Sequence, residues 1–436
     1  MTNESARETA VKLLGRIENG GAYSNILLDE YFKKSNMNLI DKRFCTALFY
    51  GTLELRYKLD KIISFYSLKP AEKLNSDVRN ILRTALYQIL FMNSVPESAA
   101  VNEAVKLVKS SAVKGYVNAL LRNFLRSEKK LPSFENKLEQ IAFDCSCPPC
   151  LVDKLCRECG EDDAMDLLED SLEVPPVTVK ANTFKTTVED LKTLLESEGF
   201  AVKQNEFIEN YLEISGGSPE ASRAFKNGLF HVQDLASGLC CKALNPKAGM
   251  TVLDMCAAPG GKTFTIAEMM DNKGCVKAFD LHENRVRLIT SGAKRIGLSS
   301  VTAAVNNAKV YNSEIGFADA VLCDVPCSGF GVIRHKPEIK YKSFDELDKL
   351  AEIQYKILDC SASYLKAGGT LIYSTCTLSK VENDRNAEKF LKEHTEFAPA
   401  ALWNDFGYFD GETSLSVFPS YFGSDGFYIS KFVRMR

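Results

Sequence analysis

The sequence predicts a multidomain protein with an all-helical N-terminal domain, a small α/β module and a larger doubly wound α/β domain. Three observations lead to this fold class. The chain has 436 residues, more than one ordinary core holds. Apolar residues recur at helical spacing up to about residue 126. Strands and helices then alternate from about residue 234 onward, as in parallel sheets.

Composition narrows the class of protein. A hydrophobic content of 45% and a charged content of 25% are typical of a soluble globular chain. No apolar run approaches the ~20 residues of a membrane helix, and the N-terminus lacks a signal-peptide core. The 14 cysteines are spread over a large chain, which predicts reduced thiols and a cytoplasmic location. The net charge of −3 limits any nucleic-acid surface to a local patch.

Residues 1–130 are predicted to form the helical domain, because their apolar positions repeat at the spacing of one helix face. Pro96 separates two of these helices, and the polar stretch 127–132 is the predicted linker. The helix-face positions are Ala10, Leu13, Leu14 and Ile17, then Val78, Ile81, Leu82, Ala85 and Ile89, then Val101, Ala104, Val105 and Val108, and finally Val117, Leu120, Leu121 and Phe124.

Residues 131–233 are predicted to form the small mixed module. Short β-rich runs at 177–180, 211–214 and 228–232 indicate strands, and the pattern over 188–198 indicates a helix.

Residues 234–436 are predicted to form the doubly wound domain. Its expected strands are Thr251–Met255, Val276–Asp280, Val301–Val305, Ala320–Cys323 and Thr370–Ser374, with helices such as Thr263–Met270 and Asn284–Ile296 between them.

A glycine-rich loop follows the first of these strands. Gly261-Lys262-Thr263 resembles the end of a P-loop, but Cys256 stands where a P-loop needs glycine, and the dinucleotide fingerprint is missing as well. The glycines allow backbone N–H groups to approach a ligand at a helix N-terminus. Asp280, at the end of the next strand, is placed to accept hydrogen bonds from ribose hydroxyls. S-adenosylmethionine fits these parts best, and a phosphate ligand or a purely structural turn are the alternatives.

Two cysteines, Cys327 and Cys376, each follow a predicted buried strand, so both are expected at the edge of the sheet where a ligand crevice opens. Methylation of carbon 5 of a pyrimidine requires a thiol, because carbon 5 becomes nucleophilic only after a thiolate adds at carbon 6. Asp324, three residues before Cys327, can hold or share a proton at the N3 edge of cytosine. The alternative is that both cysteines are small buried hydrophobic residues.

The motifs that surround these residues resemble those of RNA cytosine-C5 methyltransferases. In the N-terminal part, 95–103 and 115–123 resemble a NusB-like helical RNA-binding domain, and the fusion resembles the bacterial Sun (Fmu) family. The matching strings are Asp254-Met255-Cys256-Ala257-Ala258-Pro259-Gly260-Gly261-Lys262-Thr263, Asp324-Val325-Pro326-Cys327-Ser328-Gly329-Phe330-Gly331-Val332, Tyr373-Ser374-Thr375-Cys376-Thr377-Leu378, Val381-Glu382-Asn383, Asp425-Gly426-Phe427-Tyr428 and His231-Val232-Gln233-Asp234.

The resemblance implies a NusB-like domain, a ferredoxin-like module and a Rossmann-like methyltransferase domain. It implies that Cys376 attacks carbon 6, that Cys327 helps to release the enzyme, and that Asp324 contacts the cytosine. The residues that would hold S-adenosylmethionine are Cys256, Ala257, Ala258, Pro259, Gly260, Gly261, Lys262, Asp280, Asn307 and Asp324. One departure is that Asn306-Asn307 stands where the family usually has an aspartate that contacts the adenine side; asparagine can still donate and accept there.

Other polar residues carry weaker signals. Cys147 and Cys150, with Cys156 and Cys159, form two CxxC pairs, but the gap between the pairs is very short and the second reads as helical. Buried or incidental thiols are therefore expected, and no metal. His335 lies in a basic stretch that is expected either to face RNA or to be an ordinary solvated loop.

The leading hypothesis is an enzyme that methylates carbon 5 of a cytosine in 16S ribosomal RNA, by resemblance cytosine 967. The cytosine must be unpaired or flipped out to be reached. We expect a monomer that binds neither membrane nor DNA. Two alternatives remain: an RNA-binding module without catalysis, and a DNA cytosine methyltransferase in which the Pro-Cys thiol itself attacks.

Overall fold

The computed structural model describes residues 4–20 and 23–435. The chain divides into two compact units, one made of residues 1–173 and 333–342 and the other of residues 174–332 and 343–436. Within the described ranges, no helix is both long and apolar enough to cross a membrane.

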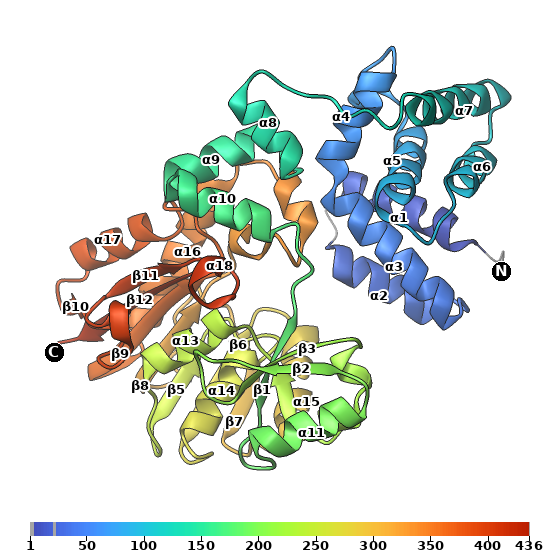
Figure 1. Cartoon of the computed structure of the whole chain (residues 1–436). Helices are drawn as coiled ribbons and strands as arrows, with labels where there is room; N and C mark the ends of the chain where they lie inside the picture. The colour runs from blue at the N-terminus through green and yellow to red at the C-terminus, as the bar shows by residue number, and fades with distance from the viewer. Residues whose placement is uncertain (1–3, 21–22, 436) are drawn as a thin grey trace. The chain divides into compact units, whose positions relative to one another are not determined.

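The N-terminal unit is all helical (Figure 1). Helices were predicted over residues 1–130 only, whereas residues 131–173, predicted as part of the small module, are also helical and belong to this unit. Its helices bury one apolar face each; in α7, for example, Val117, Leu120, Leu121 and Phe124 are at most 4% exposed. Asparagine side chains accept the first free backbone N–H groups of α3, α5 and α8. The helices are α1 (Ala6–Gly20), α2 (Ser24–Lys34), α3 (Leu39–Glu54), α4 (Arg56–Tyr66), α5 (Ser76–Phe91), α6 (Glu97–Leu107), α7 (Ser111–Arg126), α8 (Lys137–Asp144), α9 (Pro149–Cys159) and α10 (Glu161–Asp170).

A ten-residue segment, 333–342, belongs to this helical unit although the rest of the second half of the chain does not. It contains the 3-10 helix η4 (Pro337–Tyr341). The Glu338 carboxylate accepts the backbone N–H of Ser24 at 2.9 Å, and the Tyr341 hydroxyl accepts that of Tyr57 at 3.0 Å. Arg334 pairs with Asp170 at 3.1 Å. His335, in the same segment, is exposed.

The second unit begins with a small four-stranded antiparallel sheet of order β2-β3-β1-β4. Its strands are β1 (Val177–Ala181), β2 (Ala201–Gln204), β3 (Tyr211–Ser215) and β4 (Phe230–Val232), and its helices are α11 (Val188–Ser197) and α12 (Arg223–Lys226). Strand β2 was not predicted, because three of its four residues are exposed and the run lacks a buried face. The other three strands and α11 are confirmed.

The large sheet has the order β10-β12-β9-β8-β5-β6-β7 (Figure 1). Its five predicted strands are confirmed and are parallel, whereas β10, β11 and β12 pair antiparallel at one edge and were not predicted. The strands are β5 (Thr251–Asp254), β6 (Cys275–Asp280), β7 (Val301–Val305), β8 (Ala318–Asp324), β9 (Leu365–Thr375), β10 (Phe397–Pro399), β11 (Ser414–Val417) and β12 (Phe427–Arg434).

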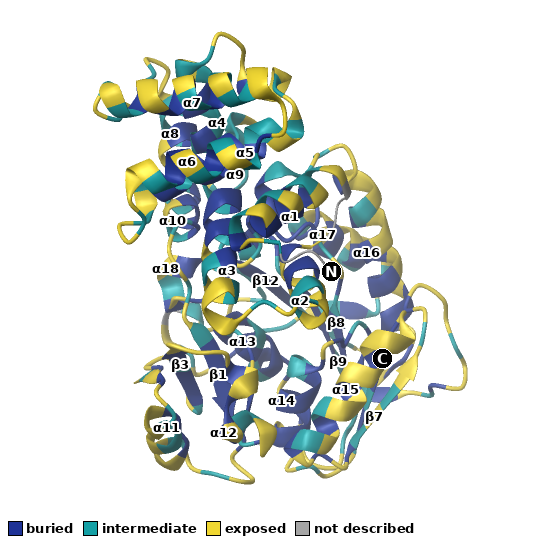
Figure 2. Ribbon diagram, turned by 90° about the vertical axis from the view of Figure 1, so that its right-hand side faces the viewer, coloured by how far each residue is buried: buried dark blue, intermediate teal, exposed yellow. Residues whose placement is uncertain are grey.

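Helices cover both faces of this sheet. One face carries α13 (Leu235–Leu244), α14 (Gly261–Met269) and α15 (Glu283–Ile296), and the other carries α16 (Leu347–Ala362) and α17 (Asp384–Glu393). A further short helix, α18 (Pro419–Phe422), precedes β12. Figure 2 shows buried strands between helices whose outer sides are exposed. The strand order reverses between β5 and β8, which in doubly wound sheets is where ligands bind.

Candidate active site at the strand ends

The glycine loop lies where the strand order reverses, between the end of β5 at Asp254 and the start of α14 at Gly261. Gly260 has a φ of 115°, and a Cβ there would lie 2.4 Å from the ring of Phe264. Only glycine fits such a backbone and such a contact. The free N–H groups of the first turn of α14 therefore face the loop, where they can bind a polar group of a ligand.

Lys262 and Asp324 form an ion pair between the start of α14 and the end of β8. The ammonium lies 2.7 Å from Oδ2 of Asp324, and Ser374 donates to Oδ1 at 2.8 Å. Burial alone would lower the pKa of Lys262, but the nearby carboxylate outweighs burial and holds that pKa above its usual value. Lys262 is therefore charged at neutral pH. The Asp324 side chain is 26% exposed, so a bound base can reach it.

The remaining predicted cofactor residues lie at neighbouring strand ends. Asp280, at the end of β6, accepts the backbone N–H of His282 at 3.1 Å and pairs with Arg285 at 3.2 Å. Arg285 also donates to the carbonyl of Ala258 at 2.8 Å, which ties β6 to the glycine loop. Asn307 is exposed just after β7, and its side-chain oxygen accepts the backbone N–H of Lys309 at 3.2 Å.

Asp254, the last residue of β5, is almost fully buried and accepts the Thr263 hydroxyl at 2.7 Å. Burial raises its pKa to about 7. This carboxyl group was not among the predicted site residues. The sequence signal that marks it is its position as the last residue of a buried strand, immediately before the glycine loop.

The sulfur atoms of Cys327 and Cys376 lie 3.0 Å apart. Cys327 follows β8 and Cys376 follows β9, and these two strands are paired in parallel. Both side chains are partly exposed. The neighbouring Cys376 sulfur and burial raise the pKa of Cys327 well above its usual value. Cys327 therefore keeps its proton at neutral pH and can donate it toward the Cys376 sulfur.

Cys327 and Cys376 each lie in a loop that follows a strand, β8 or β9, and we call these segments the two cysteine loops. Two glycines connect them through backbone contacts. Gly331, in the Cys327 loop, donates to the carbonyl of Cys376 at 3.1 Å and accepts the N–H of Gly426 at 2.8 Å. A Cβ on Gly331 would lie 1.9 Å from the carbonyl oxygen of Gly426, so no side chain fits between them. The motif 425–428 therefore completes the pair of cysteine loops.

These strand ends fit a bound S-adenosylmethionine. The loop 256–262 supplies backbone N–H groups, and Asp280 supplies a carboxylate at the position where nucleotide folds bind ribose. The partly exposed Asp324 carboxylate lies at the end of β8, where it can face a cationic group. The loop itself is not a P-loop, because Cys256 stands where a triphosphate-binding loop needs glycine.

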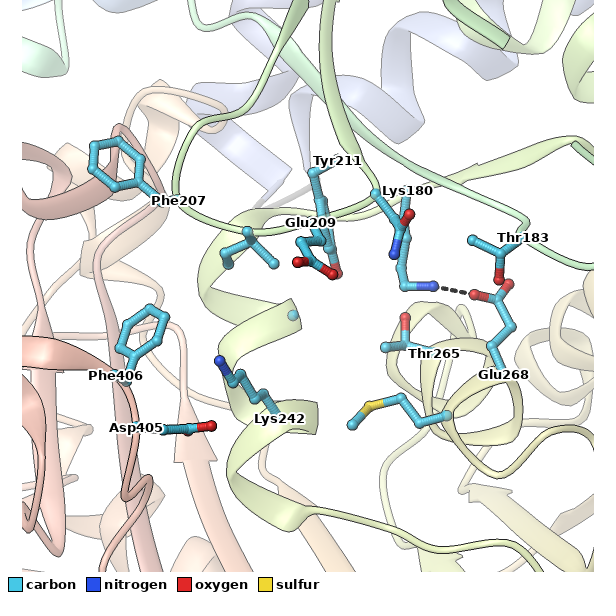
Figure 3. Close-up of a pocket in the computed structure, with 14 residues that line it drawn as sticks. Lys180, Thr183, Phe207, Glu209, Tyr211, Lys242, Thr265, Glu268, Asp405 and Phe406 are labelled. Carbon is cyan, nitrogen blue, oxygen red and sulfur yellow. Dashed lines mark hydrogen bonds and ion pairs between the residues drawn. The ribbon is translucent and has the colours of Figure 1, made fainter. Parts of the chain in front are cut away.

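A separate cavity of about 600 Å³ lies elsewhere in the same unit, and none of the predicted site residues lines it. Figure 3 shows Phe207 and Phe406 on one side of it and the Lys180–Glu268 ion pair on the other. This pair is buried and joins β1 of the small module to α14. Burial raises the pKa of Glu268. Sequence reasoning missed the pair because its residues are 88 positions apart.

The cysteines of the two CxxC pairs differ in exposure. Cys147 is buried, Cys150 is exposed, and Cys156 and Cys159 are intermediate. The second pair lies on α9, as its periodicity predicts. Across residues 4–20 and 23–435, no group of three or more His, Cys, Asp or Glu side chains is arranged to hold a metal ion.

Three family models match the chain. "16S rRNA methyltransferase RsmB/F" matches residues 241–433, "NusB family" matches residues 4–126, and "Methyltr_RsmF/B-like, ferredoxin-like domain" matches residues 147–219. The order of these matches agrees with the predicted order of a NusB-like domain, a ferredoxin-like module and a methyltransferase domain.

Individual proteins match over the same length. The chain is 37% identical to the probable ribosomal RNA small subunit methyltransferase B of Bacillus subtilis (strain 168), over 98% of each chain. The crystal structure of PH0851 superposes with a TM-score of 0.82 at 28% identity, again over 98% of each chain. NSun6 from Pyrococcus horikoshii, solved with SFG, shares the fold over 66% of this chain and 98% of its own, with a TM-score of 0.60 at 21% identity.

The 37% identity over 98% of the chain and the order of the three matched domains both indicate the same family. The chain belongs to the RsmB/F family of 16S rRNA methyltransferases, whose cofactor is S-adenosylmethionine.

Proposed function

We propose that this protein methylates carbon 5 of a cytosine in 16S ribosomal RNA through a covalent adduct between Cys376 and carbon 6 of the base. Asp324 contacts the N3 edge of the cytosine, and Cys327 assists release. The observation that carries the proposal is the pair of sulfur atoms 3.0 Å apart, with Asp324 on the strand that leads to Cys327.

The first step is addition. The Cys376 thiolate forms a bond to carbon 6, and the electrons of the carbon 5–carbon 6 double bond move toward carbon 5. Asp324 assists by holding or sharing a proton at N3, and Lys262 and Ser374 hold the carboxylate in place for this. S-adenosylmethionine, when bound, supplies the methyl group that carbon 5 takes up.

The second step is release of the enzyme, in which Cys327 acts as the base and Cys376 as the leaving group. The Cys376 sulfur is the first cause of the raised pKa of Cys327. Once that sulfur is bonded to carbon 6 it no longer carries charge, so Cys327 ionises more readily and releases its proton to solvent. The Cys327 thiolate can then accept the proton from carbon 5. The carbon 5–carbon 6 double bond re-forms, and the Cys376 thiolate leaves.

The binding of S-adenosylmethionine is proposed to involve the loop after β5 and residues at three neighbouring strand ends. We assign the backbone of 256–262, together with Asp280, Asn307 and Asp324, to the binding of S-adenosylmethionine. Two features support this assignment. Gly260 has a φ of 115°, which allows a tight backbone turn, and Arg285 contacts both Asp280 and the Ala258 carbonyl, which holds the loop beside the end of β6. Asn307 is exposed just after β7 and can donate or accept at the adenine side.

The target is proposed to be an unpaired or flipped cytosine, cytosine 967 by resemblance to the family, because carbon 6 of a stacked and paired base is out of reach of a thiol. We propose that residues 1–130 and 131–233 add RNA affinity and that 234–436 carries catalysis. We further propose a cytoplasmic monomer that does not act on DNA. The 14 cysteines, spread over a large chain, suit a reducing compartment.

The test is transfer of label from S-adenosylmethionine to unmethylated 16S ribosomal RNA, followed by nucleoside analysis. We expect 5-methylcytosine at one site, and its absence from the same site in cells that lack the protein. If no label is transferred although the RNA binds, the protein is an RNA-binding module without catalysis. If duplex DNA is methylated instead, the Pro-Cys thiol of Cys327 becomes the expected nucleophile.

A further inference from the structure

A fully buried carboxylate lies behind the Cys327 loop. Glu382 accepts the backbone N–H of Ser328 at 2.9 Å and the Ser328 hydroxyl at 2.5 Å. Gln354 donates both to this carboxylate, at 2.8 Å, and to the carbonyl of Pro326, at 3.0 Å. The residues on both sides of Cys327 are therefore held by one network.

The next residue in the chain holds the other cysteine loop in the same way. Asn383 accepts the Thr375 hydroxyl at 2.6 Å and donates to the carbonyl of Thr377 at 2.9 Å. These two threonines flank Cys376. The Ser328 and Thr377 hydroxyls lie 2.8 Å apart and join the two halves. The side chains of Glu382 and Asn383 are both buried.

A buried carboxylate is unfavourable unless hydrogen bonds compensate for lost hydration, and an apolar residue could fill the same space at lower cost. The hydrogen bonds of the Glu382 carboxylate named above lead to Ser328, which is next to Cys327, and to Gln354. Such a group restricts backbone geometry, because each bond has a preferred length and direction. Two adjacent residues that each hold one cysteine loop set the distance between the two sulfur atoms.

We propose that Glu382 and Asn383 are positioning residues that fix the spacing of Cys327 and Cys376. Neither touches a reacting atom. The effect on catalysis rests on the function proposed above, whereas the effect on sulfur spacing does not. The two parts can therefore be tested separately.

The informative variants are E382A and E382Q. Alanine removes every bond to Ser328 and Gln354. Glutamine can keep them, because its oxygen can accept from the Ser328 N–H and Gln354 while its amide group donates to the Ser328 hydroxyl. E393A is the control, since Glu393 is an exposed carboxylate at the end of α17 that accepts the Tyr355 hydroxyl at 2.5 Å and lies outside the Glu382 network.

Sulfur spacing is measured by oxidation with diamide. The reagent takes up the two thiol hydrogens across its nitrogen–nitrogen double bond while the two sulfur atoms form a disulfide. Mass spectrometry of the peptide pair follows the Cys327–Cys376 bond. We expect wild type, E382Q and E393A to form it at similar rates and E382A to form it about tenfold more slowly, because misplaced groups lose effective concentration. Equal rates in wild type and E382A would overturn the proposal.

Catalysis is measured on the same proteins. We expect kcat of E382A to fall by about 100-fold with the KM for RNA within about twofold of wild type, and E382Q to restore kcat. A glutamine variant with a kcat as low as that of the alanine variant would show that charge, not positioning, is required, which also contradicts the proposal.

If E382A does not fold, S328A, which removes only the hydroxyl bonds, is expected to slow disulfide formation about threefold. An unchanged rate would contradict the proposal. Wild type that forms the disulfide but methylates no RNA would refute the proposed function alone.

Discussion

The sulfur atoms of Cys327 and Cys376 lie 3.0 Å apart although 49 positions separate them in the chain. Their strands, β8 and β9, are parallel neighbours, so both cysteines leave the sheet at the same edge. The neighbouring Cys376 sulfur and burial hold the pKa of Cys327 well above its usual value, so Cys327 keeps its proton at neutral pH. The geometry thus brings two thiols within contact of each other, as the proposed roles of attack and release require.

The ion pair between Lys262 and Asp324 should be energetically coupled. The K262M variant leaves a largely buried carboxylate without its cation and is expected to lower the free energy of unfolding by about 3 kcal/mol. The double variant K262M/D324N should lose less than the sum of the two single variants, because no unpaired charge remains. Urea unfolding of the four proteins measures the coupling; strictly additive losses would contradict it.

The contact between Gly331 and Gly426 predicts a steric effect. G331A places a methyl group 1.9 Å from a backbone oxygen, so one of the two cysteine-loop segments must move. We expect a loss of about 3 kcal/mol, since overpacking at a fixed backbone is strongly unfavourable. The matched control is G115A in α7, where nothing lies within 4 Å and alanine should stabilise by about 1 kcal/mol. Thermal unfolding of both variants checks this, and equal midpoints would refute it.

A buried charge cluster in the helical unit predicts a pH dependence. Glu18 contacts Arg83 at 2.5 Å, Arg79 at 3.2 Å and Arg56 at 3.4 Å. Burial would raise the pKa of Glu18, but the three arginines outweigh burial and lower it to about 2. A lowered carboxyl pKa stabilises the fold above the unfolded value near 4.5, and this stability is lost as pH falls toward 2.

The E18Q variant should therefore be about 3 kcal/mol less stable than wild type at pH 7, and the difference should shrink between pH 4.5 and pH 2. Unfolding free energies across this pH range measure the difference. The control is E103Q, in the exposed Lys106–Glu103 pair, which should change stability by less than about 0.5 kcal/mol. A difference for E18Q that does not depend on pH would show that the cluster does not hold Glu18 ionised.

The helices and the central parallel strands could be predicted, because each is marked by the spacing of apolar residues within a short stretch of the sequence. The buried runs that became β5, β8 and β9 are apolar and bounded by turn residues, so the strand ends at Asp324 and Cys376 could be placed from the sequence. The parallel arrangement follows from helices between strands, and it predicts that both cysteines meet at one edge.

Features that depend on distant residues were not predicted. β12 joins the sheet by pairing with β9, more than 50 positions earlier, and nothing local marks it as antiparallel. Segment 333–342 lies within a stretch predicted as catalytic, yet it is held by Ser24 and Tyr57. The hydrogen bonds of Glu382 likewise connect residues 54 positions apart, which no periodicity reveals.

Cys376 is proposed to attack carbon 6 and Cys327 to assist release, and the variants C376A and C327A test this assignment most directly. Each is mixed with 16S ribosomal RNA and S-adenosylmethionine, and covalent protein–RNA adduct is measured on a denaturing gel. We predict that C376A forms no adduct and that C327A accumulates adduct because release is slow. Adduct formation by C376A together with its loss in C327A would contradict the account.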